Sequence, residues 1–396
     1  MSWAFSAKIA APALSLASAR PPQAGAGGGK ARIFPKTQTP NFRLSGFSSL
    51  PYPAACMTGI LLVNLGTPDA PTRGAVYRYL QQFLLDGRVI DINPLARNLL
   101  VRGIIVPFRS GKSAKAYREL WTPEGSPLKV YGERLARQVQ AILGDGYAVE
   151  LAMRYQQPSI EAAIGRLMQA RVDRIKVFTL FPQYASATVG SVHEAVMQVL
   201  ARQQVIPALE FVSSYATWPA MVDLFADNAR RFDLASYDHI LFSYHGLPQR
   251  QLHKADAAGH CLRSPDCCQT LSPSNQFCYS AQCYATTRAI AGRLSLSPDR
   301  YTVCFQSRLG KDPWTQPYTQ QVVEHWAKEK KAKRLLVFCP AFTADCLETT
   351  IEIGEEYREE FVHWGGERLD LVPSLNDHPA WAAAIAGRLS DALPQT

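Results

Sequence analysis

The sequence predicts an α/β fold of two similar halves, each a parallel sheet with helices on both faces, with a cleft between the halves. Two observations predict it. Apolar runs of strand length alternate with segments of helical period, which is typical of parallel sheets covered on both faces. The runs also form two successive series of four, so the same unit is expected twice.

The expected strands of the first series lie at 59–66, 149–155, 174–183 and 208–215, and those of the second at 239–246, 301–307, 334–340 and 369–374. Helical-period segments between them span residues 127–143, 159–169, 218–232 and 319–331. We expect the N-terminal half to span residues 57–232 and the C-terminal half residues 233–396. Ligands should bind at the carboxyl ends of the strands, as in other open α/β sheets.

Residues 1–56 form a separate segment. They are rich in Ala, Ser, Gly and Pro, and they contain six basic residues and no Asp or Glu. Such a composition buries too little apolar surface to fold, so we expect a disordered extension. It is either translated only through a wrong start, with Met57 as the true initiator, or an organellar transit peptide. We prefer the wrong start.

Charge and motifs exclude several classes of function. The net charge is +9 for the whole chain but only +3 without residues 1–56, which argues against binding to nucleic acid. No Gly-x-Gly-x-x-Gly or Walker A motif follows a strand, which disfavours dinucleotide-binding and P-loop enzymes. No run of eighteen apolar residues occurs, so no transmembrane helix is expected.

Residues 89–115 depart from the strand–helix rhythm. Apolar clusters alternate there with basic side chains at Arg97, Arg102, Arg109, Lys112 and Lys115. This pattern suits a segment at a membrane surface, with aliphatic groups towards acyl chains and cations towards headgroups. An ordinary core helix with a solvated basic face explains it equally well.

The most informative strand is the fifth, which ends in His245-Gly246-Leu247-Pro248. A histidine at a strand end is held rigidly, as proton transfer or metal binding requires. Glu348, Glu352 and Glu356 follow a later strand at four-residue spacing. On an α-helix these carboxylates share one face, and like charges so placed usually serve a cation or a reaction. Together with His245 they suit handling of a divalent metal and removal of protons.

Other strand ends carry aromatic and basic residues, at Arg154-Tyr155, at Tyr184 and at Trp314. Rings and cations around one cleft suit a flat, apolar, anionic ligand. Each of these residues is equally compatible with a core or surface position.

Five of the nine cysteines, Cys261, Cys267, Cys268, Cys278 and Cys283, lie within residues 259–284. In a reducing cytosol such a group favours metal binding over disulfides. Four thiolates hold either Zn²⁺ or an iron–sulfur cluster, and the spacing C-x5-C-C-x9-C-x4-C matches no standard pattern. Free thiols are the remaining interpretation. As ligands we choose Cys261, Cys268, Cys278 and Cys283, with Cys267 as the spare.

Several of these segments resemble motifs of the ferrochelatases, which complete haem synthesis. The resemblance covers about residues 59–389, in the order LVNLGTP (62–68), GSPL (125–128), RY (154–155), FPQY (181–184), SYHGLP (243–248), FQSRLG (305–310) with PW (313–314), and FTAD (342–345) with ET (348–349). It implies two flavodoxin-like halves that hold a porphyrin in the cleft. Residues 89–115 would be the lip that touches the membrane, and the enzyme would be cytoplasmic, or organellar if residues 1–56 are a transit peptide.

The resemblance also implies roles for individual residues. His245 and Glu348 would bind Fe²⁺, which is a substrate, and accept protons, and Glu352 and Glu356 would continue an acidic path. The porphyrin pocket would be lined by Leu65, Arg154, Tyr155, Tyr184 and Trp314. Cys346 stands where many members have a second histidine, which leaves the route of metal delivery open. Some bacterial members carry a [2Fe–2S] cluster on an internal cysteine segment, which favours a cluster at residues 259–284.

The expected reaction is insertion of Fe²⁺ into protoporphyrin IX to form protohaem. A coproporphyrin or cobalt chelatase of the same fold, and a non-catalytic haem or iron–sulfur sensor, are the alternatives. The sequence does not determine the oligomeric state or the side from which the metal enters.

Overall fold

A computed structural model of the chain describes residues 57–264, 266–310 and 312–390. The predictions for residues 1–56 lie outside these ranges. Within them, four parallel strands form the first sheet in the order β2-β1-β3-β4. Their bounds are β1 (Thr58–Gly66), β2 (Tyr147–Tyr155), β3 (Arg174–Thr179) and β4 (Ala208–Val212).

The second sheet repeats this arrangement with the parallel order β6-β5-β7-β8. Its strands are β5 (His239–His245), β6 (Tyr301–Gln306), β7 (Arg334–Phe338) and β8 (Arg368–Leu371). Both sheets therefore have the central order of flavodoxin-like folds, in which ligands bind outside the carboxyl ends. All eight expected strands are confirmed. Most end a few residues earlier than predicted, because the polar motifs at their ends do not pair with a neighbouring strand.

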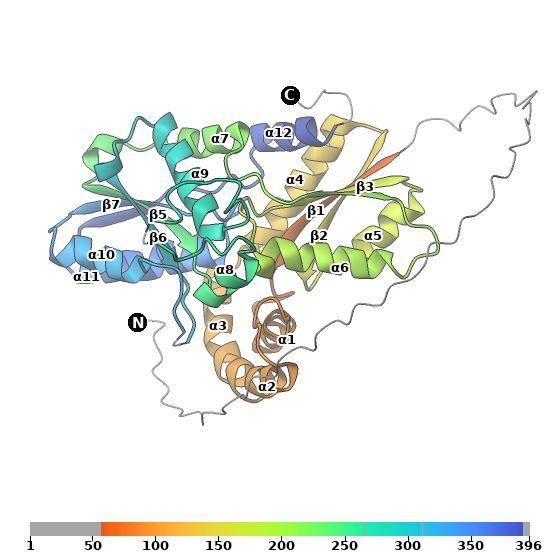
Figure 1. Cartoon of the computed structure of the whole chain (residues 1–396), viewed down its shortest axis with the longest axis horizontal. Coiled ribbons are helices and arrows are strands. Elements are labelled where there is room, and N and C mark those ends of the chain that lie inside the picture. The colour runs from red at the N-terminus through yellow and green to blue at the C-terminus, as the bar shows by residue number, and fades with distance from the viewer. Residues whose placement is uncertain (1–56, 265, 311, 391–396) are drawn as a thin grey trace, which may run out of the picture. The chain divides into compact units, whose positions relative to one another are not determined.

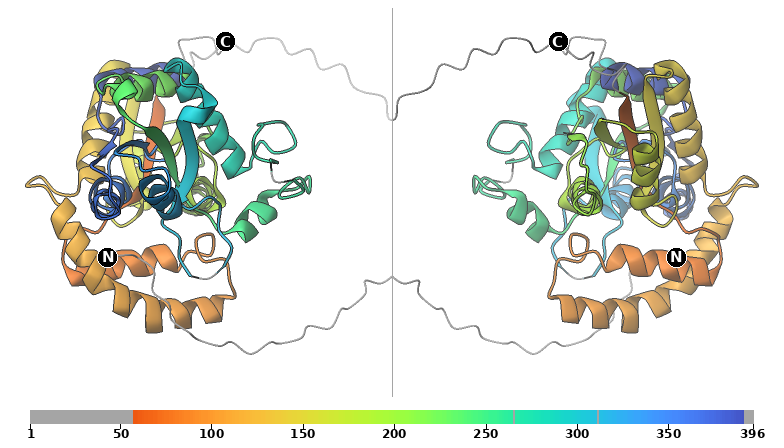
Figure 2. Two further views of the ribbon diagram at one scale, coloured as in Figure 1. Left: turned by 90° about the vertical axis from the view of Figure 1, so that its left-hand side faces the viewer. Right: turned by 90° about the vertical axis from the view of Figure 1, so that its right-hand side faces the viewer.

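Helices cover both sheets (Figures 1 and 2). In the N-terminal half they are α1 (Arg73–Leu84), α2 (Pro94–Leu100), η1 (Val101–Ile105), α3 (Val106–Leu120), α4 (Pro127–Leu143), α5 (Ile160–Gln169), η2 (Ser186–Gly190), α6 (Ser191–Leu200) and α7 (Pro219–Ala229). In the C-terminal half they are η3 (Leu234–Ser236), α8 (Gln249–Ala255), α9 (Tyr279–Arg293), η4 (Pro298–Arg300), α10 (Thr319–Lys328), η5 (Leu347–Tyr357), α11 (Arg358–His363) and α12 (Pro379–Leu389). The segments η1, η2 and η5 are π-helices, and η3 and η4 are short 3₁₀ turns.

The central strands β1 and β5 are almost wholly buried, as expected for strands covered on both faces. The last helix, α12, packs on α4 and α7 of the first half. Its end is fixed there by a 2.9 Å hydrogen bond from Lys176 Nζ on β3 to the carbonyl of Leu389. The sheets separate near the predicted boundary, but the C-terminal helix returns to the N-terminal half.

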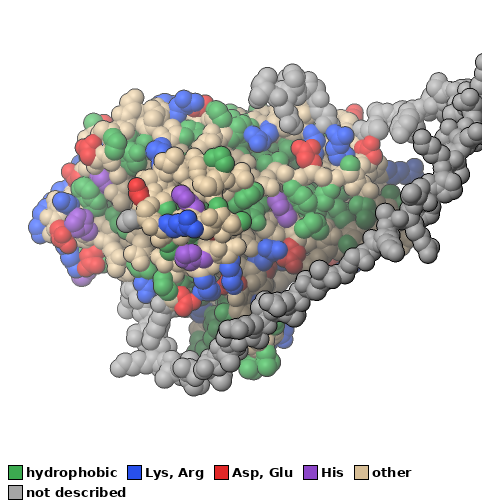
Figure 3. Space-filling view, viewed as in Figure 1, with side chains coloured by type: hydrophobic (Ala, Val, Ile, Leu, Met, Phe, Trp, Pro, Cys, Tyr) green, Lys and Arg blue, Asp and Glu red, His purple; other side chains and the backbone are tan. Residues whose placement is uncertain are grey.

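Helices α1, α2 and α3 form a projection below the sheets in Figure 1. Four of its apolar side chains, Leu95, Leu99, Ile104 and Phe108, are exposed, and Phe108 reaches 81%. Apolar atoms gather at this tip in the space-filling view (Figure 3). Within the described ranges, no helix is long and apolar enough to cross a membrane.

Candidate active site

His245 is the last residue of β5 and is half-buried. Its Nδ1 lies 2.7 Å from the carbonyl oxygen of Gly246. Because a carbonyl oxygen can only accept a hydrogen bond, Nδ1 is the donor in this contact, and the neutral form of the ring then has its lone pair on Nε2. Metal-binding histidines are commonly held in this way, with the second ring nitrogen fixed by a backbone carbonyl. Nε2 is thus able to bind a metal or accept a proton.

The residue after His245 has to be glycine. A Cβ on Gly246 would lie 2.9 Å from the Gln306 carbonyl oxygen and 3.2 Å from the Trp314 ring. Trp314, a predicted pocket residue, therefore lies close to Gly246, the residue that follows the histidine. Its indole Nε1 is buried and has no hydrogen-bond partner among the described residues.

Gln306 connects the histidine to the acidic helix. It pairs with His245 across β5 and β6 and is almost completely buried. Its Nε2 donates a 2.8 Å hydrogen bond to the carbonyl of Glu348, and its Oε1 accepts one of 2.6 Å from Ser243. The first turn of η5 is therefore fixed to the strand beside His245. These contacts join residues that are far apart in the sequence, and Gln306 was not among the predicted site residues.

The three glutamates lie on η5, and the prediction that their helix is an α-helix is wrong. In a π-helix the hydrogen bonds run from residue i to i+5, so the turn is wider, but a step of four residues still falls close to one turn. The shared face of Glu348, Glu352 and Glu356 therefore survives the change of helix type. Such π-helical turns occur frequently at functional sites.

Glu352 is enclosed by donors from the end of β6. Its carboxylate accepts hydrogen bonds from the Ser307 amide at 3.0 Å and the Ser307 hydroxyl at 2.6 Å, and one of 3.3 Å from Gln306. Burial nevertheless raises the pKa of Glu352 to about 7, since it outweighs these donors, and the charge of Glu348 adds to the rise. A carboxyl group that titrates near neutrality can both accept and release protons.

Cys346 occupies the N-cap position of η5. Its backbone N–H donates a 3.0 Å hydrogen bond to Thr349 Oγ1, and its buried side chain accepts from the helix. Burial raises the pKa of this thiol well above its ordinary value. The position where the resemblance leads one to expect a second histidine therefore holds a neutral helix cap.

On the N-terminal half, Arg154 and Tyr155 converge on Asp86, which sequence reasoning missed. The Asp86 carboxylate accepts 2.7 Å and 2.9 Å hydrogen bonds from Arg154 Nη2 and the Tyr155 hydroxyl. Burial would raise the pKa of Asp86, but hydrogen bonds from Ser191 and the Arg88 amide and the charge of Arg154 hold it below its ordinary value. Arg154 is thus paired, and Tyr155 is wholly buried.

Asp86 gave no local signal, because a single aspartate outside the expected strands and helices belongs to no motif.

Leu65 and Tyr184 lie at two other strand ends. Leu65 packs against a cluster that contains Tyr155, Tyr117 and Ile351 of η5, so it borders the acidic helix. Tyr184 is half-buried, and its backbone N–H donates a 2.8 Å hydrogen bond to Gln282 of α9. The structure thus brings Leu65 and Tyr155 near η5, whereas Arg154 and Tyr184 belong to the neighbouring strand ends of the first sheet.

The lip also reaches the acidic helix. Burial, and then the charge of Glu348, raises the pKa of Tyr79 on α1 far above its ordinary value. Burial lowers the pKa of Arg109 on α3 even though the charges of Glu348 and Glu352 oppose the shift. Glu348 therefore lies within electrostatic reach of α1 and of α3, whose first part belongs to the lip.

The cysteine segment stands out from the side of the second half, between α8 and α9 (Figure 2). The sulfur of Cys268 lies 3.5 Å from that of Cys267 and 3.8 Å from that of Cys278. Cys278 is the N-cap of α9, where a hydrogen bond from Cys268 and backbone amides lower its pKa to about 7. Cys283 is 0% exposed and lies in the core. Across the described part of the chain, no set of three or more His, Cys, Asp or Glu residues is arranged to hold a metal ion.

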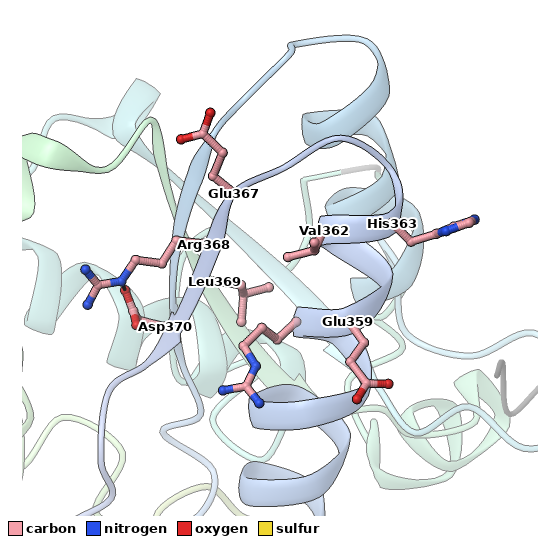
Figure 4. A pocket seen from close by; sticks show the side chains of 8 residues that line it. Glu359, Val362, His363, Glu367, Arg368, Leu369 and Asp370 are labelled. Atoms are coloured by element: carbon pink, nitrogen blue, oxygen red, sulfur yellow. Dashed lines mark ion pairs between the residues drawn. The ribbon is translucent and has the colours of Figure 1, made fainter.

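Figure 4 shows a separate hollow between α11 and β8. Acidic and basic side chains alternate around it, with Glu359, Glu367 and Asp370 beside Arg358 and Arg368. None of the predicted site residues lines it, and its charges compensate one another, so we assign it no function.

Comparisons with solved structures give weak similarities. The structure titled "SirB from Bacillus subtilis with Fe3+" has a TM-score of 0.46 and 11% identity, and covers 84% of this chain and 94% of that one. CbiX, described as the terminal enzyme for sirohaem biosynthesis in denitrifying bacteria, has a TM-score of 0.41 and 13% identity, over 85% of this chain and all of that one. The fold assignment rests on the two sheets themselves.

Sequence comparisons are much stronger. The Ferrochelatase family model matches residues 57–393. A Coxiella burnetii ferrochelatase is 44% identical over 83% of this chain and 92% of its own length. A Legionella pneumophila ferrochelatase is 42% identical over 83% of this chain and 97% of its own length. The family match spans both sheets, His245 and the acidic helix, and we conclude that this chain belongs to the ferrochelatase family.

Proposed function

We propose that this protein inserts Fe²⁺ into protoporphyrin IX to form protohaem, the final step of haem biosynthesis. The observation that carries the proposal is the fixed relationship of His245 to Glu348. Gln306 lies beside the histidine in the sheet and hydrogen-bonds the Glu348 backbone. This arrangement holds an imidazole and a carboxyl group from two different strand ends near each other.

The chemistry of metal insertion fits these groups. Fe²⁺ replaces two pyrrole protons, so the site has to handle a divalent cation and accept protons. Imidazole and carboxylate both bind Fe²⁺, and both accept protons. Glu352, with its pKa raised to about 7, and then Glu356 continue the row of carboxyl groups along η5. We propose that this row carries protons or metal between the site and solvent.

We propose five porphyrin-binding residues: Leu65, Arg154, Tyr155, Tyr184 and Trp314. Their roles differ according to their environments. Trp314 and Leu65 offer apolar contact, and Tyr184 presents a half-buried ring. Tyr155 is wholly buried and Arg154 is paired with Asp86. These two residues would therefore stabilise the proposed pocket wall rather than contact the porphyrin with a free polar group.

An anaerobic insertion assay tests the proposed function. The wild-type chain is mixed with protoporphyrin IX or coproporphyrin and with Fe²⁺ or Co²⁺, and the product is followed by its absorbance. The expected result is turnover with Fe²⁺ and protoporphyrin IX. Preference for coproporphyrin or Co²⁺ would support the related chelatases, whereas haem binding without turnover would support the sensor.

We propose that α2 and the start of α3 touch a membrane surface, so that the protein is cytoplasmic and peripheral to the inner membrane. Helix α2 has no buried side chain, and Leu95, Leu99 and Phe108 are exposed beside Arg97 and Arg102. Exposed apolar groups flanked by cations are the features of interfacial helices. Flotation with anionic vesicles at low and high salt tests this contact.

We propose that the cysteine segment binds a [2Fe–2S] cluster, with Zn²⁺ as the alternative. Thiolate sulfur is the donor that both prefer, and the lowered pKa of Cys278 supports it as a ligand. The sequence-based set of Cys261, Cys268, Cys278 and Cys283 includes one thiol in the core. The full burial of Cys283 and the 3.5 Å separation of Cys267 and Cys268 favour Cys267 as the fourth ligand.

A further inference from the structure

We infer that Tyr279 and Gln282, on the first turn of α9, are positioning residues that hold opposite sides of the active site. Tyr279 fixes the strand end that carries His245, and Gln282 fixes the segment that carries Tyr184. The inference rests on the proposed function, because it assigns a metal-handling role to His245 and a porphyrin-binding role to Tyr184.

Tyr279 acts on His245 through the backbone. Its hydroxyl donates a 2.9 Å hydrogen bond to the carbonyl oxygen of His245, and its side chain is buried. Gly246 follows β5 and Gln306 ends the neighbouring strand β6, and the Gly246 amide donates a 2.8 Å hydrogen bond to the Gln306 carbonyl. The tyrosine thus secures the last residue of β5 just where the ladder ends. Because the imidazole projects from this residue, a small backbone shift moves Nε2 with it.

Gln282 acts on Tyr184 in a similar way. Its Oε1 accepts hydrogen bonds of 2.8 Å from both the Tyr184 backbone amide and the Ser214 hydroxyl. Its Nε2 donates a 2.7 Å hydrogen bond to the carbonyl of Gln276 in the cysteine segment. The side chain is 1% exposed, so these three bonds have no water to replace them. One buried amide therefore links the Tyr184 segment, the loop after β4 and the cysteine segment.

The cysteine segment ends on this same turn. Cys278 is the N-cap of α9 and immediately precedes Tyr279, and Phe277 packs its ring against that of Tyr184 at 5.5 Å. The first turn of α9 therefore adjoins the cysteine segment and also carries the two residues that hold His245 and Tyr184. Tyr279 and Gln282 are both buried, so their effect passes through the residues that they hold.

The two residues should produce different kinetic signatures. Tyr279→Phe removes the hydroxyl that bonds the His245 carbonyl and also contacts the buried Cys283 thiol. We expect the KM for Fe²⁺ to rise about fivefold while the Kd for protoporphyrin stays within about twofold. Gln282→Met keeps the shape of the side chain but removes its polar atoms. For this variant we expect the Kd for protoporphyrin to rise about tenfold, with a smaller change in the KM for Fe²⁺.

Two matched variants separate positioning from general loss of stability. Tyr237→Phe removes a 2.6 Å hydrogen bond to Asp370 just before the amino end of β5, the strand that carries His245 at its other end. Gln140→Met removes an amide that accepts from Val149 and donates to Gly144 and Tyr147, away from the site. Both controls should lower the thermal midpoint as Tyr279→Phe and Gln282→Met do, and leave KM and Kd unchanged.

The outcomes are distinguishable. Porphyrin binding is read from fluorescence quenching and requires no turnover, whereas KM is read from the insertion assay. If the wild type binds protoporphyrin but shows no turnover, the proposed function fails, and the Gln282→Met binding result still tests the inference. If the wild type turns over, two results overturn the inference. One is the same change in KM and Kd in all four variants, and the other is no change in either KM or Kd in Tyr279→Phe and Gln282→Met.

Discussion

The side-chain amide of Gln306 donates a 2.8 Å hydrogen bond to the main-chain carbonyl of Glu348. Gln306 is the partner of His245 in the sheet, so this bond sets how far the first carboxylate of η5 lies from the histidine. The same amide also reaches Glu352 at 3.3 Å. The proposed metal-handling groups are therefore held by a buried amide side chain.

Gln306→Met should weaken this connection. The variant loses the bonds to Glu348 and Glu352 and the one that Gln306 accepts from Ser243, whose hydroxyl keeps its 2.9 Å contact with Thr319. We expect a loss of about 2 kcal/mol in the free energy of unfolding, since each buried unpaired group costs about 1 to 3 kcal/mol. We also expect about a tenfold lower kcat/KM for Fe²⁺. Urea titration and the insertion assay measure the two effects, and an unchanged kcat/KM would contradict the role of Gln306.

His245→Ala should abolish metal insertion while protoporphyrin still binds. The substitution removes the imidazole whose Nδ1 is fixed by the Gly246 carbonyl, and thus the free Nε2. Binding is followed by fluorescence quenching, and insertion by absorbance. His239→Ala is the matched control, because His239 is a buried histidine at the amino end of the same strand. It should lose stability and keep turnover; retained turnover in His245→Ala would refute the assignment.

Glu352 should make stability depend on pH. Its pKa rises from 4.5 to about 7 on folding, so the folded chain keeps a proton that the unfolded chain loses. This contribution is fully present below pH 4.5 and is lost as pH rises through 7, at up to about 1.4 kcal/mol per pH unit between the two values. Glu352→Gln should remove this part of the slope. Urea midpoints of both proteins from about pH 5 to 8 measure it, and equal slopes would contradict the prediction.

Phe108→Asp should weaken membrane binding. Phe108 is 81% exposed, and burial of such a side chain contributes about 1.5 to 3 kcal/mol, so binding to anionic vesicles should fall at least about tenfold. Val205→Asp is the control, because Val205 is 72% exposed but lies between α6 and β4, away from the lip. Vesicle flotation measures both variants, and equal losses would exclude a specific contact of the lip.

Cys267→Ala should lose the metal of the cysteine segment, whereas Cys283→Ala should retain it. The sulfur of Cys267 lies next to that of Cys268, whereas Cys283 is buried in the core. Metal analysis and the visible spectrum of anaerobically purified protein distinguish iron from zinc without reference to turnover. If only Cys283→Ala loses the metal, the ligands are the four cysteines chosen from the sequence. If the wild type contains no metal, the cysteines of this segment are free thiols.

Local sequence is sufficient to define the strands, their grouping in two series and the strand ends that carry function. These features are local, because burial on both faces produces apolar runs and each strand end carries its own short motif. The proposal of His245 and Glu348 as site residues therefore follows from the sequence alone. The motifs that flank them are sufficient to indicate the family, which the comparisons confirm.

How these residues are held depends on packing between distant segments. The π-helical form of η5 has the same four-residue spacing of carboxylates as an α-helix, so periodicity does not distinguish them. Asp86 and Gln306 gain their roles from partners 42 to 69 residues away. The burial of Cys283 and the proximity of Cys267 to Cys268 likewise depend on packing around α9. Contacts between distant segments leave no periodic signal, because the packing of the whole chain sets them.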